Sequence, residues 1–267
     1  MSSRAELLAV PFRALRRAGL VWGLSLAALI ILTVAFYPSF RDEPELGDLI
    51  DGMPDALISA FGLADFGTPE GFLRGNLYAV LMPLLLAVAG VLLMNGQTAA
   101  DEDAGRMEPY LAQPVSRVAV FSGRMAGVGL WLLVIGVVVV IAQVAGDAMF
   151  GLEIDTGRVI ATVVLCVLLG ALYAGIAALV AGWTGRPGVA LGVGVALAVA
   201  GYVAIALFPI SEVLAPWRHV SPWDWALGAD PLTTDTEPWR YLAVGVPAVV
   251  LGGIGAWLFS RRDIVAA

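Results

Sequence analysis

Residues 159–182, VIATVVLCVLLGALYAGIAALVAG, form a run of 24 residues that carries no charged side chain. A helix needs about 20 apolar residues to cross the hydrocarbon core of a bilayer, so this run is long enough to span a membrane. The whole chain has the same character, since 60% of its 267 residues are hydrophobic and only 14% are charged. Soluble domains carry about 25% charged residues. The sequence therefore predicts an integral membrane protein.

Five other segments match this run in length and composition. The first of them ends in VAFYPSF (residues 34–40), whereas a cleavable signal peptide has a shorter apolar region, of about 7–15 residues, that ends in small residues. We therefore expect an uncleaved span and an all-α polytopic membrane protein, with residues 18–267 as one six-span transmembrane domain. The predicted spans are 18–37, 75–95, 125–145, 159–182, 188–208 and 241–259.

The arginines indicate the orientation of these spans, because cytoplasmic segments carry an excess of basic residues. With the N-terminus inside, ten of the 15 arginines fall on the inner side and sixteen of the 22 acidic residues fall on the outer side. The net charges are then +4 inside and −11 outside, which together give the −7 of the chain. We expect both termini in the cytoplasm, with an inner loop at 96–124 and outer loops at 38–74, 146–158 and 209–240.

The composition excludes several kinds of chemistry. All 15 basic residues are arginine, so the chain cannot form a phosphate-binding loop of the type GxxxxGK[ST]. Cys166 is the single cysteine, which excludes an internal disulfide. The predicted spans contain no Asp, Glu, Lys or His, which argues against ion-coupled transport, and there is no HExxH motif or intramembrane pair of carboxylates. We expect a protein that is not an enzyme and that holds no cofactor or metal of its own.

Residues 1–17 predict an amphipathic helix that precedes the first span. Apolar residues recur there at i, i+4 and i+7, with arginines on the other side, and a helix of this kind lies in the membrane interface. Pro11 lies within the stretch and leaves a frayed tail as the alternative. The candidate interfacial residues are Leu8, Phe12, Leu15, Arg16 and Arg17.

The two long outer loops differ in character. Loop 38–74 combines eight acidic residues with apolar residues at helical spacing, which predicts a short helix with a solvated acidic face. Loop 209–240 is rich in Pro and Trp and contains the single histidine, His219. We expect a re-entrant hairpin in this loop and a simple polar contact for His219.

The inner loop contains a polar island, DEDAGRMEPYLAQPVSR (residues 101–117), in an otherwise apolar chain. Its acidic start favours a helix N-terminus, and the pattern predicts a helix that continues through Met107 and Tyr110 until Pro114 ends it. Such a helix could dock in a groove of a cytosolic partner. It could equally be a solvated connection between two spans, and the residues alone do not decide between these interpretations.

The island resembles the loop between the second and third spans of type-2 ABC transporter permeases. In both, an acidic pair is followed by Gly, Glu, an apolar pair and PVSR, although the family often has Leu-Leu where this chain has Tyr-Leu. YPSF after the first span, SPWDWALGADPL before the sixth and FSRRDI near the end are similar to further parts of the same family. The matching residues of the island are Asp101, Glu102, Gly105, Glu108, Tyr110, Leu111, Pro114 and Arg117.

The resemblance implies a permease in the cell membrane that works with a separate cytosolic ATPase, with two permeases and two ATPases in each exporter. The eight island residues would then form the coupling helix, residues 1–17 would form the interfacial helix, and ATP and Mg would be bound by the ATPase. Alternating access would follow, with an apolar or amphipathic substrate such as a drug, an antibiotic or a lipid. The second permease would be another copy or a relative.

Two other functions remain open from the sequence. One is a self-contained channel or secondary transporter, and the other is a membrane scaffold that does not transport. The span 188–208 is dense in Gly and Ala, which favour close helix packing. This span could form a dimer seam or a mobile interface, and the sequence does not separate the two.

Overall fold

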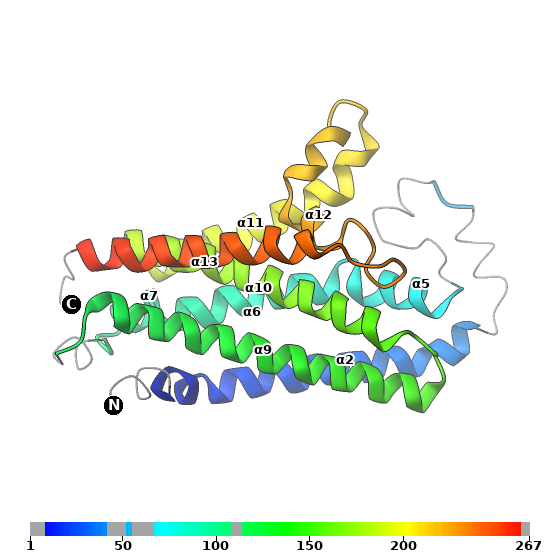
Figure 1. Ribbon diagram of the computed structural model, residues 1–267, viewed down its shortest axis with the longest axis horizontal. Coiled ribbons are helices and arrows are strands. Elements are labelled where there is room, and N and C mark those ends of the chain that lie inside the picture. Colours follow the sequence, from blue (N-terminus) through cyan, green and yellow to red (C-terminus); the bar gives the residue numbers. More distant parts are fainter. Residues whose placement is uncertain (1–8, 42–51, 55–66, 108–113, 263–267) are drawn as a thin grey trace.

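The computed structural model describes residues 9–41, 52–54, 67–107 and 114–262 of the chain. In these residues the regular structure is helical, and six helices are long and apolar enough to cross a membrane, which confirms the predicted fold class and number of spans. Figure 1 shows them aligned along one axis. Their main helices are α2 (Arg16–Arg41), α6 (Leu81–Gln97), α9 (Arg117–Phe150), α10 (Thr156–Thr184), α11 (Pro187–Leu207) and α13 (Pro238–Arg261). The second span as a whole covers Pro69–Asp103 and the fifth covers Pro187–Ile210.

The helices alternate in direction, so the bundle has two distinct ends. We call the end with the starts of α2, α9 and α11 the proximal end, and the opposite end the distal end. The start of α2 and the end of α13 both lie at the proximal end (Figure 1). Cytoplasmic placement of the proximal end stays a prediction.

Helix caps, and not hydropathy, set the ends of the third and fourth spans. Helix α9 begins after Ser116, whose hydroxyl accepts from the amide of Ala119, and it ends at Gly151, which has a left-handed φ of 68°. Asp155 caps the start of α10 in the same way as Ser116 caps α9. Helix α9 is therefore 34 residues long, much longer than the predicted 125–145. The predicted outer loop 146–158 shrinks to the residues between Phe150 and Thr156.

The second span is composite, whereas the sequence predicted one helix at 75–95. It begins with α5 (Pro69–Leu73), continues through a π-helical turn, η1 (Arg74–Tyr78), and then becomes α6. Pro83 has no amide hydrogen and its ring interferes with the carbonyl four residues earlier, so a regular helix restarts only at Leu81. The start of this span therefore extends into the predicted outer loop 38–74.

Helix α10 forms the centre of the bundle and packs against α6, α9, α11 and α13. Small residues bring the backbones close together. A Cβ added at Gly170 would lie 2.7 Å from the carbonyl oxygen of Leu86, and one at Gly175 would lie 2.6 Å from that of Ala248. Within the most apolar stretch of each helix, 67% of the residues are buried in α10 but only 22% in α11. Helix α11 is therefore peripheral, and whether it forms a dimer seam stays a prediction.

The connection between α11 and α13 contains η2 (Phe208–Ile210), η3 (Ala215–Val220) and α12 (Pro222–Leu227), and it projects from one side of the bundle (Figure 1). Trp223 anchors it, because the fully buried indole donates to the hydroxyl of Tyr173 at 3.1 Å. His219 lies on the surface 2.8 Å from a carboxylate oxygen of Asp224, the polar contact that the sequence predicted. Entry of this connection into the bilayer stays a prediction.

The N-terminal segment packs on protein over the part that the structure describes. Residues 9–14 are helical and Leu15 separates them from α2 by one turn residue. The ring of Phe12 stacks on Trp131 of α9 at 4.7 Å between centroids, and the indole donates to the carbonyl of Phe12 at 2.7 Å. Leu15 is buried and Arg16 and Arg17 are exposed, while Leu8 lies outside the described residues. The interfacial position of this helix stays a prediction.

Candidate functional site

The polar island begins at the proximal end with α7 (Ala99–Asp103), a helix of only five residues. The predicted continuation of this helix through Met107 is wrong, because residues 104–107 form a turn. Gly105 accounts for the stop, since its φ of 68° is left-handed and ends a right-handed helix. The part of the island at 108–113, with Glu108, Tyr110 and Leu111, lies outside the described residues.

Asp101 holds a buried arginine of α9. One carboxylate oxygen accepts from Nη1 of Arg124, and the other accepts from Nε of Arg106 at 2.8 Å. The side chain of Arg124 is only 5% exposed and also donates to the carbonyl of Gln97, the last residue of α6. A buried guanidinium is tolerated only with such partners. Asp101 therefore fastens α7 and the end of α6 to the start of α9.

Glu102 makes a second connection, to the end of α13. Both of its carboxylate oxygens accept from Nη2 of Arg262, one of them at 2.7 Å, and the Glu102 side chain is 10% exposed. The carbonyl of Arg262 in turn accepts from Nη1 of Arg117 at 2.8 Å. A Cβ added at Gly185 would lie 1.9 Å from Nη1 of Arg262, so the α10–α11 turn also lies against this guanidinium.

The structure thus places three of the predicted site residues, Asp101, Glu102 and Arg117, in two sets of ion pairs and hydrogen bonds that are joined through α7. We call the two sets together, with Arg124 and Arg262, the proximal brace. The sequence predicted a helix that could dock on a partner through this island, but the carboxylates of Asp101 and Glu102 are paired with arginines of the same chain. The exposed residues in the described part of the island are Asp103, Ala104, Arg106, Pro114, Ser116 and Arg117.

Arg124 and Arg262 were not identified as functional from the sequence. Arg124 directly precedes the predicted third span, and Arg262 belongs to the FSRRDI motif, so both were counted only in the charge balance. An arginine at the very edge of an apolar run signals an ion pair, because burial of its side chain requires a partner. The sequence offered this signal but not the identity of the partners.

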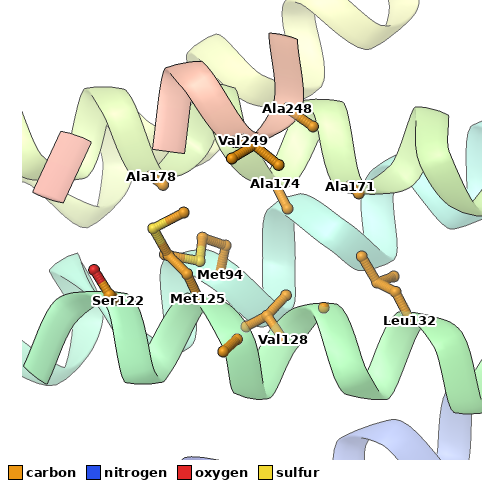
Figure 2. A pocket seen from close by; sticks show the side chains of 13 residues that line it. Met94, Ser122, Met125, Val128, Leu132, Ala171, Ala174, Ala178, Ala248 and Val249 are labelled. Carbon is orange, nitrogen blue, oxygen red and sulfur yellow. The ribbon is translucent and has the colours of Figure 1, made fainter. Parts of the chain in front are cut away.

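A second feature of interest is a cavity of about 350 Å³ in the body of the bundle. Side chains of α6, α9, α10 and α13 line it, and Figure 2 shows two methionine side chains, Met94 and Met125, close together at one end. Ser122 is the one lining residue with a polar side chain. A site of this composition suits an apolar ligand and offers no acid or base for catalysis.

The described residues contain no group of three or more His, Cys, Asp or Glu side chains that could hold a metal ion. The proximal brace consists of ion pairs and hydrogen bonds, and the cavity lining is apolar except for Ser122. Nothing in either arrangement resembles a nucleophile beside a base.

Comparison with known proteins gives the family. No curated protein matches the chain. A family model described as the C-terminal domain of the multidrug efflux system permease Rv1217c matches residues 5–260. This region includes five of the six long helices in full, α13 up to its penultimate residue, and every residue that lines the cavity. The chain therefore belongs to the family of this domain and is a multi-pass membrane permease of the efflux type.

Proposed function

We propose that this chain is the transmembrane subunit of an ATP-binding-cassette exporter in the cell membrane, driven by a separate cytosolic ATPase that docks on the proximal end. The proximal brace is the observation that carries the proposal. It joins a short exposed turn to three long helices, which is what a permease needs if it is to receive a force from outside the bilayer.

Charge supports the orientation. Of the described residues, the proximal end carries arginines at both helix starts and helix ends, and an excess of arginine favours the cytoplasmic side. In the described part of the distal end, acidic residues such as Glu70, Asp155 and Glu237 predominate at the helix ends. The cytoplasmic ATPase would therefore meet α7 and the turn that follows it.

The geometry of the brace supports a role in transmission. A five-residue helix on its own is too short to act as a lever, but Asp101 ties α7 to α9 and Glu102 ties it to α13. A displacement of the exposed turn at 104–107 would then move the proximal ends of α6, α9 and α13 together. Coupling between distant sites requires a packed, connected path of this kind.

The power would come from the partner, since the chain has no lysine for a phosphate-binding loop. The substrate would be apolar or amphipathic, because the cavity lining bears no charged side chain. Two permeases and two ATPases would alternate between inward-open and outward-open states, and the second permease would be another copy or a relative.

The test is purification of the chain from its own membranes in mild detergent, with identification of the proteins that accompany it. We expect a stoichiometric ATPase, and we expect Asp103→Arg to remove it, because Asp103 is the exposed acid of α7. The matched control is Asp235→Arg, a fully exposed acid at the distal end, which should retain the ATPase. A folded chain that never carries an ATPase would refute the proposal and favour a self-contained channel or a scaffold.

A further inference from the structure

We infer that the cavity between α9 and α13 is a lateral binding site for an aliphatic chain, contained within one protomer and filled directly from the bilayer. As a binding site it does not depend on the proposed ATPase partnership. Its position, its opening, its chemistry and its shape each support this assignment.

The cavity exists because α13 packs on α10 more closely than on α9. Gly175 of α10 lies against the backbone of Ala248, so these two helices are in close contact. The floor of the cavity is made by small α10 residues such as Ala174 and Ala178, which leave space in front of them. Figure 2 shows Ala248 and Val249 of α13 on one side and Val128 and Leu132 of α9 on the other.

The cavity opens sideways, to the surface that faces lipid in a membrane. Ala126 and Gly129 of α9 line it and are exposed, and Val249 of α13 lines it with 73% of its surface exposed. Contacts closer to the proximal end close it in that direction. A Cβ added at Gly252 would lie 2.0 Å from the Cε atom of Met125, so α9 and α13 are in contact at this level, although the lining continues to Ser122. A ligand would therefore enter from the hydrocarbon core.

An aromatic contact next to Ser122 closes the cavity toward the proximal end. The rings of Phe121 and Phe259 lie 5.1 Å apart between centroids, and both residues are buried. The path from the cavity to the proximal end is thus blocked by aromatic packing in the state that the structure describes.

The lining selects a neutral apolar ligand. It bears no charged side chain, and the hydroxyl of Ser122 is its one polar side-chain group. A cation or an anion would lose its hydration here without gaining a partner, which is costly. Met94 and Met125 suit a flexible ligand, because the unbranched thioether side chain adapts to irregular shapes.

The shape favours a chain over a compact molecule. On α9 the lining residues extend from Ser122 to Leu132, a distance of about 15 Å along a helix axis at 1.5 Å per residue. A volume of about 350 Å³ spread over that length describes a narrow slot parallel to the helices. This volume lies near the lower limit for small-molecule sites, and lipid chains in the bilayer have the same direction as the slot.

Photolabelling of the full chain in phosphatidylcholine nanodiscs, without any ATPase, tests the inference. One probe is dodecanol with a diazirine at its chain end, and the other is a phosphatidylcholine with a diazirine at the end of one acyl chain. We expect saturable labelling of lining residues such as Met94 and Met125 that excess unlabelled dodecanol abolishes. Labelling by the alcohol alone would assign the site to free amphiphiles, and labelling by both probes would assign it to aliphatic chains that include those of membrane lipid.

A matched pair of variants locates the site. Gly129→Phe fills the mouth of the slot, and Gly192→Phe places the same side chain on α11, which contributes nothing to the lining. Both glycines are helical and have open space around an added Cβ, so the two substitutions perturb the fold to a similar extent. We expect labelling to fall by about tenfold or more, equivalent to about 1.4 kcal/mol of binding free energy, in Gly129→Phe only.

Two results obtained with the unaltered chain would overturn the inference, whether or not the variants fold. One is labelling of the unaltered chain that does not saturate. The other is labelling confined to outward-facing residues of α9 such as Leu133, which is 58% exposed and does not line the slot. Equal labelling of folded Gly129→Phe and Gly192→Phe would also overturn it.

Discussion

Removal of the Asp101 carboxylate should destabilise the proximal end because a buried arginine loses its opposite charge. The side chain of Arg124 is 5% exposed and that of Asp101 is 15% exposed, so their ion pair is largely hidden from water. In Asp101→Ala the guanidinium of Arg124 loses its carboxylate partner and retains the carbonyl of Gln97. We expect this variant to fold but to unfold more easily.

The expected loss of stability depends on the contacts that Arg124 retains after Asp101 is removed. Breaking a fully buried ion pair by removing one partner costs about 3–5 kcal/mol. The remaining carbonyl contact and the partial exposure of Asp101 reduce this, so we expect the free energy of unfolding to fall by about 2–3 kcal/mol. The double variant Asp101→Ala with Arg124→Met removes the charge as well. Because an apolar pair can replace a buried ion pair at little cost, the double variant should lie within about 1 kcal/mol of the unaltered chain.

Denaturant unfolding of the purified chain in detergent micelles, followed by tryptophan fluorescence, measures these differences. Asp103→Ala is the matched control, since Asp103 is an exposed acid on the same short helix and should change stability by no more than about 0.5 kcal/mol. The reasoning is refuted if Asp101→Ala is as stable as Asp103→Ala. It is equally refuted if the double variant is no more stable than the single variant, because the cost would then not come from the guanidinium that lost its opposite charge.

Two further variants test the packing of the bundle. Gly90→Ala should reduce the free energy of unfolding by about 1–3 kcal/mol, because its Cβ would lie 2.2 Å from the backbone oxygen of Gly170. The control is Gly253→Ala, where an added Cβ meets open space, and it should be neutral or slightly stabilising. Similar losses of stability in both variants would contradict the close contact at Gly90. Tyr78→Phe should cost about 1 kcal/mol in the same unfolding assay, because the hydroxyl of Tyr78 donates to Oε1 of the fully buried Gln143 at 3.1 Å. Adding Gln143→Leu should recover part of that loss, and a double variant less stable than Tyr78→Phe would show that the pair is not the source.

The sequence predicted the spans well because hydrophobic length is a property of each segment alone. It placed Gln143 near the end of a span at 125–145, whereas α9 continues to Phe150 and buries this side chain completely. The error arises because a charged residue such as Asp147 ends a hydropathy window but does not end the helix. The helix ends at Gly151, whose left-handed backbone stops it.

The candidate site was predicted only in part, because its contacts join residues far apart in the chain. The acidic pair Asp101–Glu102 stood out in the sequence, but its partners Arg124 and Arg262 lie 23 and 160 residues away. No local pattern identifies such a pairing. The cavity could not be predicted at all, since it depends on a difference in spacing between α9, α10 and α13 that small residues allow but do not specify.

These pairings change which substitution tests coupling to a motor. A reversal at Glu102 would bring an arginine against Arg262, whose guanidinium already lies beside the α10–α11 turn at Gly185. A loss of stimulated ATP hydrolysis in such a variant would then report local unfolding as readily as lost docking. Asp103 projects from the same helix into solvent, so Asp103→Arg changes the charge that a partner would meet and leaves the proximal brace in place. If Asp103→Arg abolishes stimulated hydrolysis while its unfolding curve matches that of the unaltered chain, the partner docks on this turn. If hydrolysis is unchanged, the brace is a structural tie and the motor binds elsewhere.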